Sequence, residues 1–305
     1  MAERKWTAAD IPDQTGRTVV ITGANSGLGR ASASMLAGAG AAVIMACRNP
    51  QKAATAADEL RSAHPGARIE VRELDLASLA SVRRFADGIV DSGERIDVLM
   101  NNAGIMAVDR GTTEDGFELQ FGVNHLGHFA LTGLLLPVLA ANPNGTRIVN
   151  VSSMGHRAGR MDLDDPNADR RQYRRWPAYF QSKLANLLFT SELHRRLGEK
   201  GSSVVALAAH PGTATTELGK VGSSASNWVI RRAFFTMVRG PEPGALSQVR
   251  AATDVSARGG DYFGPRWMMA GRPQLETPSR RARSSSDATR LWELSERLTG
   301  ITYGI

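Results

Sequence analysis

The sequence has one cysteine, Cys47, among its 305 residues. A single cysteine excludes an intramolecular disulfide framework and a cysteine-based metal cluster, and it fits a reducing compartment. The sequence also lacks a run of 18 uncharged apolar residues, and its N-terminal residues have no apolar stretch typical of a secretory signal. We therefore expect no transmembrane helix and no signal peptide, and we predict a cytoplasmic protein.

The composition is otherwise ordinary for a globular protein, with 42% hydrophobic and 22% charged residues. The formal net charge is +7, and much of the excess lies in two arginine-rich patches, at 169–175 and 280–290. Neither patch contains a zinc knuckle or an aromatic RNA-binding signature. We interpret them as solvated surface or loop. The alternatives are a basic rim of a cofactor or substrate site and, last, a nucleic-acid interface, so we expect no nucleic-acid partner.

Short apolar runs alternate with helical patterns along the chain. The predicted strands are at 17–23, 41–48, 68–75, 96–104, 146–153 and 202–212. This alternation predicts an α/β fold with a Rossmann-like, doubly wound parallel sheet and helices on both faces. We expect a single domain over 1–305, in which 1–150 mainly binds a dinucleotide and 151–305 supplies the catalytic and substrate-binding part. Such sheets bind ligands at the carboxyl ends of their strands.

A glycine-rich turn, TGANSGLGR, follows the first predicted strand and precedes a helix. Gly23, Gly27 and Gly29 would allow a tight turn and let backbone amides approach a pyrophosphate. The spacing is G-x-x-x-G-x-G, which differs from the commoner dinucleotide pattern. A turn or packing role is the alternative, but the position between strand and helix favours a nucleotide site.

Arg48 follows the second predicted strand, where the adenosine ribose is expected. An acidic residue there would bind the 2′-hydroxyl of NAD, whereas an arginine can bind the 2′-phosphate of NADP. We therefore expect NADP(H) to be preferred over NAD(H). A solvated arginine in a turn is the alternative, and Cys47 beside it is expected to be a small packed residue.

Tyr179 and Lys183 lie four residues apart in a segment with a helical pattern that ends near Gly201. Residues at this spacing share one face of a helix. Taken alone, the pair is most simply a surface pair. The alternative is a phenol acidified by a neighbouring ammonium. Shifting a tyrosine pKa from about 10 toward 7 requires about 4 kcal/mol, which a close, partly desolvated cation can supply.

Taken together, the motifs resemble the short-chain dehydrogenase/reductase family. They are TGANSGLG, LDL with Asp75, NNAG at 101–104, Asn124 in VNHLGHF, RIVNVSS, the Tyr179/Lys183 pair and HPG at 210–212. The phrases ACRN, VNVSSMGHRAG, SKLANLLFTSEL and LWELSERLTG are most similar to the retinol dehydrogenase-like branch. Membrane-bound retinoid enzymes of that branch carry an N-terminal anchor that is not found here, so we do not assume retinol as the substrate.

The resemblance implies four catalytic residues. NADPH would deliver hydride to a carbonyl carbon while Tyr179 donates a proton to its oxygen, and alcohol oxidation is the reverse. The resemblance favours Ser153 over Ser152 as the serine that hydrogen-bonds this oxygen. Lys183 would bind the nicotinamide ribose and acidify Tyr179. Asn124 would hold a water that relays protons; a helix-kink or capping role is its alternative.

The resemblance also implies a set of cofactor contacts. Beyond Arg48, Tyr179 and Lys183, these are Gly23, Asn25, Ser26, Gly27, Leu28, Gly29, Asp75, Leu76, Asn102, Ala103, Gly104, Pro211, Gly212 and Thr213. We expect no metal site, because the spacing of His125, His128, His156 and His210 fits no zinc pattern.

Substrate contacts are expected from the segment between Ser153 and Tyr179 and from 213–238, which mixes aromatic residues with arginines. The expected substrate is a lipophilic aldehyde, ketone or alcohol, and a homo-oligomer is possible. The alternative function is a non-catalytic protein that binds NADP to sense its redox state. A sensor would not need the set Ser153, Tyr179 and Lys183.

Overall fold

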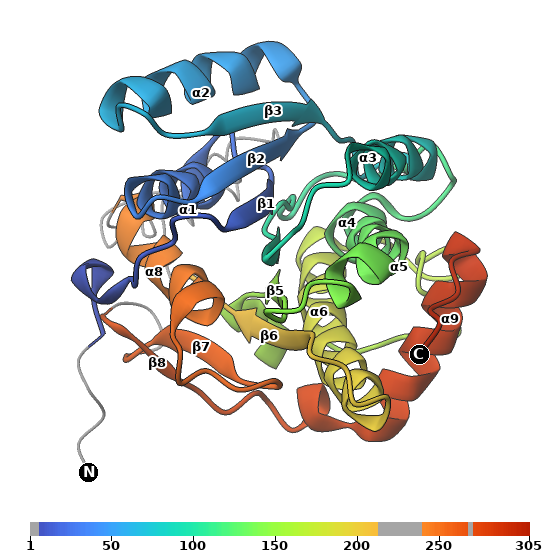
Figure 1. The fold of residues 1–305 in the computed structure, drawn as a ribbon. Coiled ribbons are helices and arrows are strands. Elements are labelled where there is room, and N and C mark those ends of the chain that lie inside the picture. Colours follow the sequence, from blue (N-terminus) through green and yellow to red (C-terminus); the bar gives the residue numbers. More distant parts are fainter. Residues whose placement is uncertain (1–5, 213–239, 268–270) are drawn as a thin grey trace.

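The computed structural model describes residues 6–212, 240–267 and 271–305. Its centre is an eight-stranded sheet with the strand order β3-β2-β1-β4-β5-β6-β7-β8 (Figure 1). The strands are β1 (Thr18–Thr22), β2 (Ala42–Cys47), β3 (Ile69–Glu73), β4 (Val98–Asn101), β5 (Arg147–Val151), β6 (Val205–Ala209), β7 (Tyr262–Pro265) and β8 (Pro273–Leu275).

Strands β1 to β7 run parallel, and only β8 pairs antiparallel, with β7. The chain order reverses between β1 and β4, which is the switch point of a doubly wound sheet. The predicted Rossmann-like α/β class is confirmed. Each of the six predicted strands contains an observed one, but β7 and β8 were not predicted, because both are short and contain proline.

Helices cover both faces of the sheet (Figure 1). One face carries α1 (Gly27–Gly38), α2 (Pro50–Ala63) and α8 (Pro241–Thr253), and the other carries α3 (Leu79–Ser92), α5 (Gly127–Ala140), α6 (Arg175–Glu199) and α9 (Ser285–Thr299). Short elements are η1 (Ala8–Asp10), α4 (Leu119–Phe121), η2 (Gly122–Leu126), η3 (Met154–Arg157) and η5 (Arg281–Arg283).

Local sequence signals set several of the helix ends. Asn49, Ser78 and Ser284 cap the N-termini of α2, α3 and α9 by accepting a hydrogen bond from a backbone amide of the first turn. The helix α6 ends at Glu199, two residues before Gly201, whose φ of +62° suits glycine. The predicted glycine stop therefore lies just beyond the observed end of the helix.

The central strands are apolar on both sides because helices cover both faces. Val19 and Ile21 of β1 belong to the core beneath α1, α2 and α8, whereas Val20 belongs to the core beneath α3, α5, α6 and α9. All three side chains are fully buried. This two-sided burial holds the carboxyl ends of the strands in fixed relative positions.

The apolar stretch Leu119–Ala140 spans α4, η2 and α5 and is the one candidate membrane span among the described residues, by length and composition. However, 67% of its most apolar window is buried inside the fold. The same composition suits a core helix of a water-soluble domain, so it is weak evidence for a span. Within the helix, η2 is a π-helical turn that contains Asn124.

Candidate active site

The predicted site residues collect at the carboxyl ends of β1, β2, β4, β5 and β6, the edge where a doubly wound sheet binds its ligands. The glycine turn follows β1 and leads into α1. Gly23 and Gly27 have φ values of +67° and +53°, which disfavour a side chain. Ser26 precedes α1 and its side chain makes no capping hydrogen bond, so the turn presents amides of the first helical turn to an anion.

Gly29 shows why this loop needs glycine. A Cβ atom here would collide with the carbonyl oxygen of Gly23 and would lie 2.6 Å from Nδ2 of Asn102. Asn102 in turn donates from Nδ2 to the carbonyl of Thr22 at 2.8 Å. The turn after β4 therefore supports the glycine turn directly. Leu28 packs beneath it, 7% exposed.

Thr22 is a supporting residue that the sequence analysis missed. Its Oγ1 accepts hydrogen bonds from the backbone amides of Asn102 (3.0 Å) and Ala103 (2.9 Å), and lies 2.9 Å from Nε2 of His128. Gln248 of α8 donates to Oδ1 of Asn102 at 3.0 Å. A polar residue at the buried end of an apolar strand was the available signal for Thr22, but no sequence signal pointed to Gln248.

At the adenosine end, Arg48 follows β2 and its side chain is exposed. Cys47 is buried beneath the glycine turn; burial raises the pKa of its thiol, and bonds from the backbone of Ala24 and Asn25 lower it. Asp75 follows β3, and its Oδ1 accepts from the amide of Ala77 at 2.9 Å. Leu76 beside it is buried in the core.

The two adjacent serines after β5 have different surroundings. Ser152 donates from Oγ to the carbonyl of Lys183 at 2.7 Å and is buried. Ser153 accepts from the amide of Gly155 at 3.1 Å and hydrogen-bonds the hydroxyl of Tyr179. The structure therefore brings Ser153, and not Ser152, to the phenol, as strand alternation requires.

Lys183 lies inside the protein, 5% exposed, and its Nζ is 5.9 Å from the ring centroid of Tyr179. Nζ donates to the carbonyl of Val151 at 3.1 Å, and burial lowers the pKa of Lys183 to about 8. A Cβ atom at Gly104 would lie 3.3 Å from this Nζ. Glycine in the NNAG turn thus keeps the ammonium within reach of a ligand.

The pKa of Tyr179 depends on burial as well as on its neighbours. Burial raises the pKa of this phenol, and the hydrogen bond with Ser153 lowers it by less. The sequence argument weighed the neighbouring ammonium but not the cost of removing a phenolate from water. In this structure the phenol is therefore held in its neutral, proton-donating form at neutral pH.

Asn124 lies in the π-turn, where its side chain points to the turn after β4. Its Oδ1 accepts from the amide of Ile105 at 2.8 Å, and its Nδ2 donates to the carbonyl of Ile105 and to Oγ of Ser182, each at 2.9 Å. The backbone carbonyl of Asn124 lies 3.1 Å from Nδ1 of His128. Both side-chain N–H groups and Oδ1 of Asn124 thus join the turn after β4 to α6, which leaves this backbone carbonyl as the group for a proton relay.

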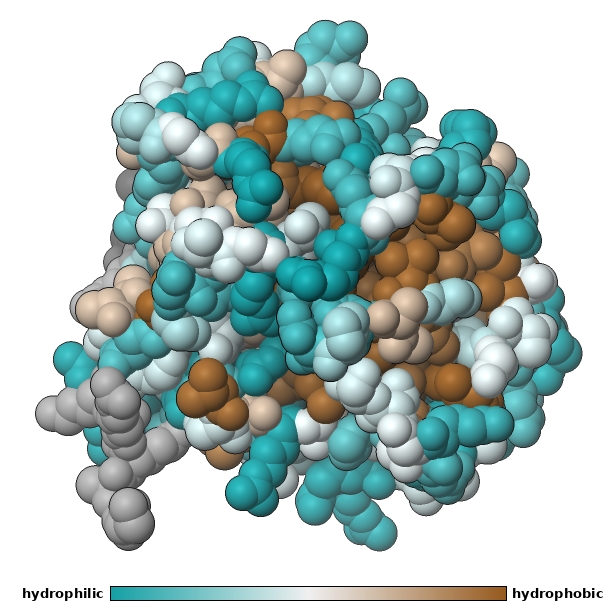
Figure 2. Space-filling view, viewed as in Figure 1, coloured by the Kyte–Doolittle hydropathy of each residue, from teal (hydrophilic) through white to brown (hydrophobic). Residues whose placement is uncertain are grey.

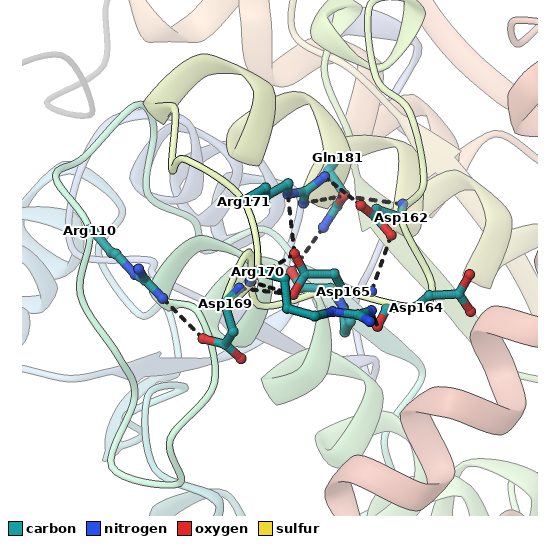
Figure 3. Close-up of polar contacts among 9 residues, drawn as sticks. Arg110, Asp162, Asp164, Asp165, Asp169, Arg170, Arg171 and Gln181 are labelled. Atoms are coloured by element: carbon teal, nitrogen blue, oxygen red, sulfur yellow. Dashed lines mark hydrogen bonds and ion pairs between the residues drawn. The ribbon is translucent and has the colours of Figure 1, made fainter.

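The segment between Ser153 and Tyr179 is folded by its own charges (Figure 3). Arg171 pairs with Asp162 at 2.9 Å and reaches Oε1 of Gln181 at 3.2 Å, while Arg110 pairs with Asp169 at 3.0 Å. Within the first arginine-rich patch, Arg171 and Arg175 form ion pairs with aspartates, whereas Arg174 is exposed and makes no ion pair with the described residues. Trp176, near the end of this segment, packs edge-on against Tyr179, with ring centroids 6.2 Å apart.

Pro211 and Gly212 follow β6 at the same edge of the sheet. The amide of Gly212 donates to Nδ1 of His210 at 3.1 Å, and Nε2 of His210 lies 3.2 Å from a carboxylate oxygen of Glu276. Thr213 and the predicted substrate segment 213–238 lie outside the described residues.

The four histidines named in the sequence analysis each have protein surroundings of their own. Burial lowers the pKa of His125 to about 3 and that of His128 to about 4. His125 lies 2.8 Å from Oγ of Ser295. Within residues 6–212, 240–267 and 271–305, no group of three histidine, cysteine or acidic side chains is arranged to hold a metal.

Comparison with known proteins agrees with this geometry. The family model described as short chain dehydrogenase matches residues 17–226. Human retinol dehydrogenase 13 is 45% identical over 299 residues, which cover 96% of this chain and 86% of the relative. Mouse retinol dehydrogenase 14 is 42% identical over 98% of this chain and 90% of its own.

A solved structure of an uncharacterised protein from Mycobacterium paratuberculosis is also similar, with 50% identity, a TM-score of 0.83 and coverage of 99% of this chain and 100% of that one. The chain belongs to the short-chain dehydrogenase/reductase family and is similar to its retinol dehydrogenases. It is an oxidoreductase that acts on CH–OH groups.

Proposed function

We propose that the protein is an NADP(H)-dependent oxidoreductase that interconverts a lipophilic aldehyde or ketone and its alcohol, with Tyr179 as the acid and base. The observation that carries the proposal is the cluster of Ser153, Tyr179 and Lys183 at the carboxyl edge of the sheet. A structural role would not require an ammonium that is 5% exposed beside a buried phenol.

The residues fit a dinucleotide. The glycine turn leaves no room for a Cβ atom at Gly29 and directs the start of α1 toward an anion. Lys183 has ammonium protons besides the one donated to Val151, and these could bind a ribose hydroxyl. The nicotinamide supplies or accepts the hydride.

Each catalytic side chain then has a defined task. The neutral phenol of Tyr179 donates its proton to the carbonyl oxygen during reduction, and Ser153 holds the same oxygen through Oγ. Lys183 stabilises the phenolate that remains, because a cation in a buried site is only weakly screened. In alcohol oxidation the phenolate accepts the proton.

Arg48 supports the preference for NADP(H). Its guanidinium is exposed at the carboxyl end of β2, and the cap of α2 is made by Asn49 and not by Arg48. Arginine binds a phosphate through two parallel hydrogen bonds, whereas an acidic residue would repel it.

The test is consumption of NADPH and of NADH with a panel of aliphatic, aromatic and retinoid aldehydes and ketones. Wild type, Tyr179→Phe and Arg48→Asp are compared. We expect Tyr179→Phe to lose about 10²- to 10⁴-fold in kcat, the usual contribution of acid–base catalysis, with unchanged NADPH affinity. Arg48→Asp should raise KM for NADPH at least tenfold and leave that for NADH unchanged or lower.

Three results would contradict parts of the proposal. Unchanged turnover in Tyr179→Phe would remove Tyr179 as the acid. A clear preference of the wild type for NADH would refute the role of Arg48. Tight NADPH binding with no turnover of any compound in the panel would favour the redox sensor.

A further inference from the structure

A second cleft lies outside the cofactor edge, and none of the assigned residues lines it. It has a volume of about 530 Å³, within the range of small-molecule sites. Its walls come from η3 and from the chain between β7 and α9. The residues that matter here are Arg157, Arg266, Glu276, Ser279, Arg280 and Arg283.

The cleft has a strong excess of positive charge, with four guanidinium groups against one carboxylate. Arg266, Arg280 and Arg283 are exposed, and their side chains make no ion pair or hydrogen bond with the described part of the chain. Arg157 donates to the backbone carbonyl of Thr277 at 3.2 Å. Like charges held in a concave site, without counter-charges, cost free energy unless an anion binds there.

The carboxylate of Glu276 does little to neutralise these charges. Its side chain is 8% exposed and its Oε2 lies 3.2 Å from Nε2 of His210. A Cβ atom at Gly264 would lie 2.6 Å from Oε1, so this oxygen faces the backbone of β7. Only Arg157 is near, at 3.8 Å from Oε2. The carboxylate is thus turned into the protein and away from most of the cleft.

The contrast with the first arginine-rich patch is informative. There, Arg171 pairs with Asp162 (Figure 3) and Arg175 pairs with Asp109, so the fold itself supplies anions for these two arginines. In the second patch, Arg290 lies 3.5 Å from Asp164, but Arg280 and Arg283 face the cleft without such partners. Arg174 of the first patch is exposed and has no such partner among the described residues either, so the difference is that Arg280 and Arg283 line a cleft.

The cleft is connected to the catalytic serine through one imidazole. His156 is fully buried; its Nδ1 lies 2.7 Å from the carbonyl of Ser153, and its Nε2 accepts from the amide of Ser279 at 3.2 Å. Arg157 is the next residue, and a 3-10 rise of about 2 Å per residue puts it about 8 Å along the chain from Ser153. One buried side chain therefore joins the wall of the cleft to the backbone of Ser153.

We propose that this cleft binds the phosphate or carboxylate group of a small molecule, held by Arg157, Arg266, Arg280 and Arg283. Guanidinium groups bind both anions through paired, charge-assisted hydrogen bonds. The anionic group belongs either to the carbonyl substrate itself, which would refine the proposed function, or to a separate ligand. The binding site does not depend on the proposed activity.

The first test is calorimetric titration of the full chain with inorganic pyrophosphate at fixed ionic strength. Saturating NADP⁺ is present, so that the glycine turn does not contribute. Arg280→Gln/Arg283→Gln removes two charges from the cleft. Arg290→Gln/Arg297→Gln removes two charges from α9 outside the cleft and is the matched control for net charge.

We expect saturable binding with one equivalent of pyrophosphate, weakened at least tenfold in Arg280→Gln/Arg283→Gln and less than twofold in the control. Equal weakening in both variants would show that only net charge matters and would overturn the site. No saturable binding to the wild type at millimolar pyrophosphate would also overturn it.

A second test separates the two sources of the anion by comparing 4-carboxybenzaldehyde with benzaldehyde, or another acidic and neutral pair that is turned over. If the anion is part of the substrate, Arg280→Gln/Arg283→Gln raises KM only for the acidic aldehyde. If it is a separate ligand, pyrophosphate changes the rate with the neutral aldehyde in wild type but not in this variant. Both results support the cleft, whereas identical kinetics of wild type and variant in every arm would contradict it.

Discussion

Replacing Gly29 by alanine tests how closely the glycine turn fits its support. The added Cβ would collide with the carbonyl oxygen of Gly23 and lie 2.6 Å from Nδ2 of Asn102. Neither neighbour can move freely, because one is backbone and the other donates to the carbonyl of Thr22 at 2.8 Å. The turn must therefore shift, and the hydrogen bond of Asn102 must lengthen or break.

The magnitude follows from three contributions. Overpacking a tight site costs about 1–3 kcal/mol, and losing one hydrogen bond costs about 0.5–1.5 kcal/mol. Because Gly29 lies in the first turn of α1, the higher helix propensity of alanine stabilises the variant by up to about 1 kcal/mol. The net destabilisation is about 0.5–3.5 kcal/mol, and a shifted turn should weaken binding of a nicotinamide cofactor at least tenfold.

The assay combines thermal unfolding with calorimetric titration of NADP⁺. Gly88→Ala is the matched control, because Gly88 lies in α3 and a Cβ there meets nothing within 4 Å. The free energy of unfolding of this control should rise by about 0.5–1 kcal/mol, and it should bind the cofactor as wild type does. If Gly29→Ala is as stable as wild type and binds NADP⁺ equally well, the close fit of the turn is refuted.

The remaining predictions concern buried titratable groups. The pKa of Lys183 is lowered by burial from 10.5 to about 8, so the unfolded chain binds more protons between these pH values and stability from this group rises with pH across that window. Lys183→Met should therefore raise Tm at pH 7, because it removes a desolvation cost of up to about 3 kcal/mol, while turnover is lost. A lower Tm at pH 7 would show that burial of the ammonium is not costly. Burial also lowers the pKa of His125 to about 3 and of His128 to about 4, so as the pH falls below 6.5 the unfolded chain takes up protons before the folded one and stability is lost. The free energy of unfolding in urea should therefore be lower at pH 5 than at pH 7, and this difference should be smaller in His125→Gln. An equal difference in that variant would contradict the assignment. Glu276→Ala removes the carboxylate beside His210. Because His210 holds the turn at Gly212, the KM for NADPH should rise about threefold to tenfold, and it should rise less in Glu276→Gln, which keeps an acceptor. Equal KM values for wild type and both variants would exclude this positioning role.

Much of the fold could be predicted from the sequence, because its signals are local. The apolar runs at β1, β2, β4, β5 and β6 are short and bounded by turn residues, and each predicted range contains the observed strand. The spacing of Tyr179 and Lys183 on one helix predicted that both reach the same region, and the structure places them 5.9 Å apart, measured from Nζ to the ring centroid.

Other features depend on tertiary contacts and left no local signal. The π-turn at Asn124 interrupts a largely apolar helical stretch, and it allows the side chain to bond Ile105 across the site. Strands β7 and β8 are short and contain proline, so they exist mainly because they extend a sheet already formed. The effect of burial, which raises the pKa of Tyr179, could not be predicted for a related reason, since burial cannot be read from a four-residue spacing.

In the described part of the chain, some charged side chains are neutralised by other residues of the fold, whereas others lack a partner that the fold supplies. The ion pairs of Arg171 and Arg110 satisfy charges that the loop itself brings, and they need no ligand. Lys183, by contrast, is removed from water beside a neutral phenol and donates to a single backbone carbonyl, that of Val151. Folding alone gives no reason to keep a cation there, because an apolar side chain would be less costly. A cofactor hydroxyl and a developing phenolate would supply the missing partners.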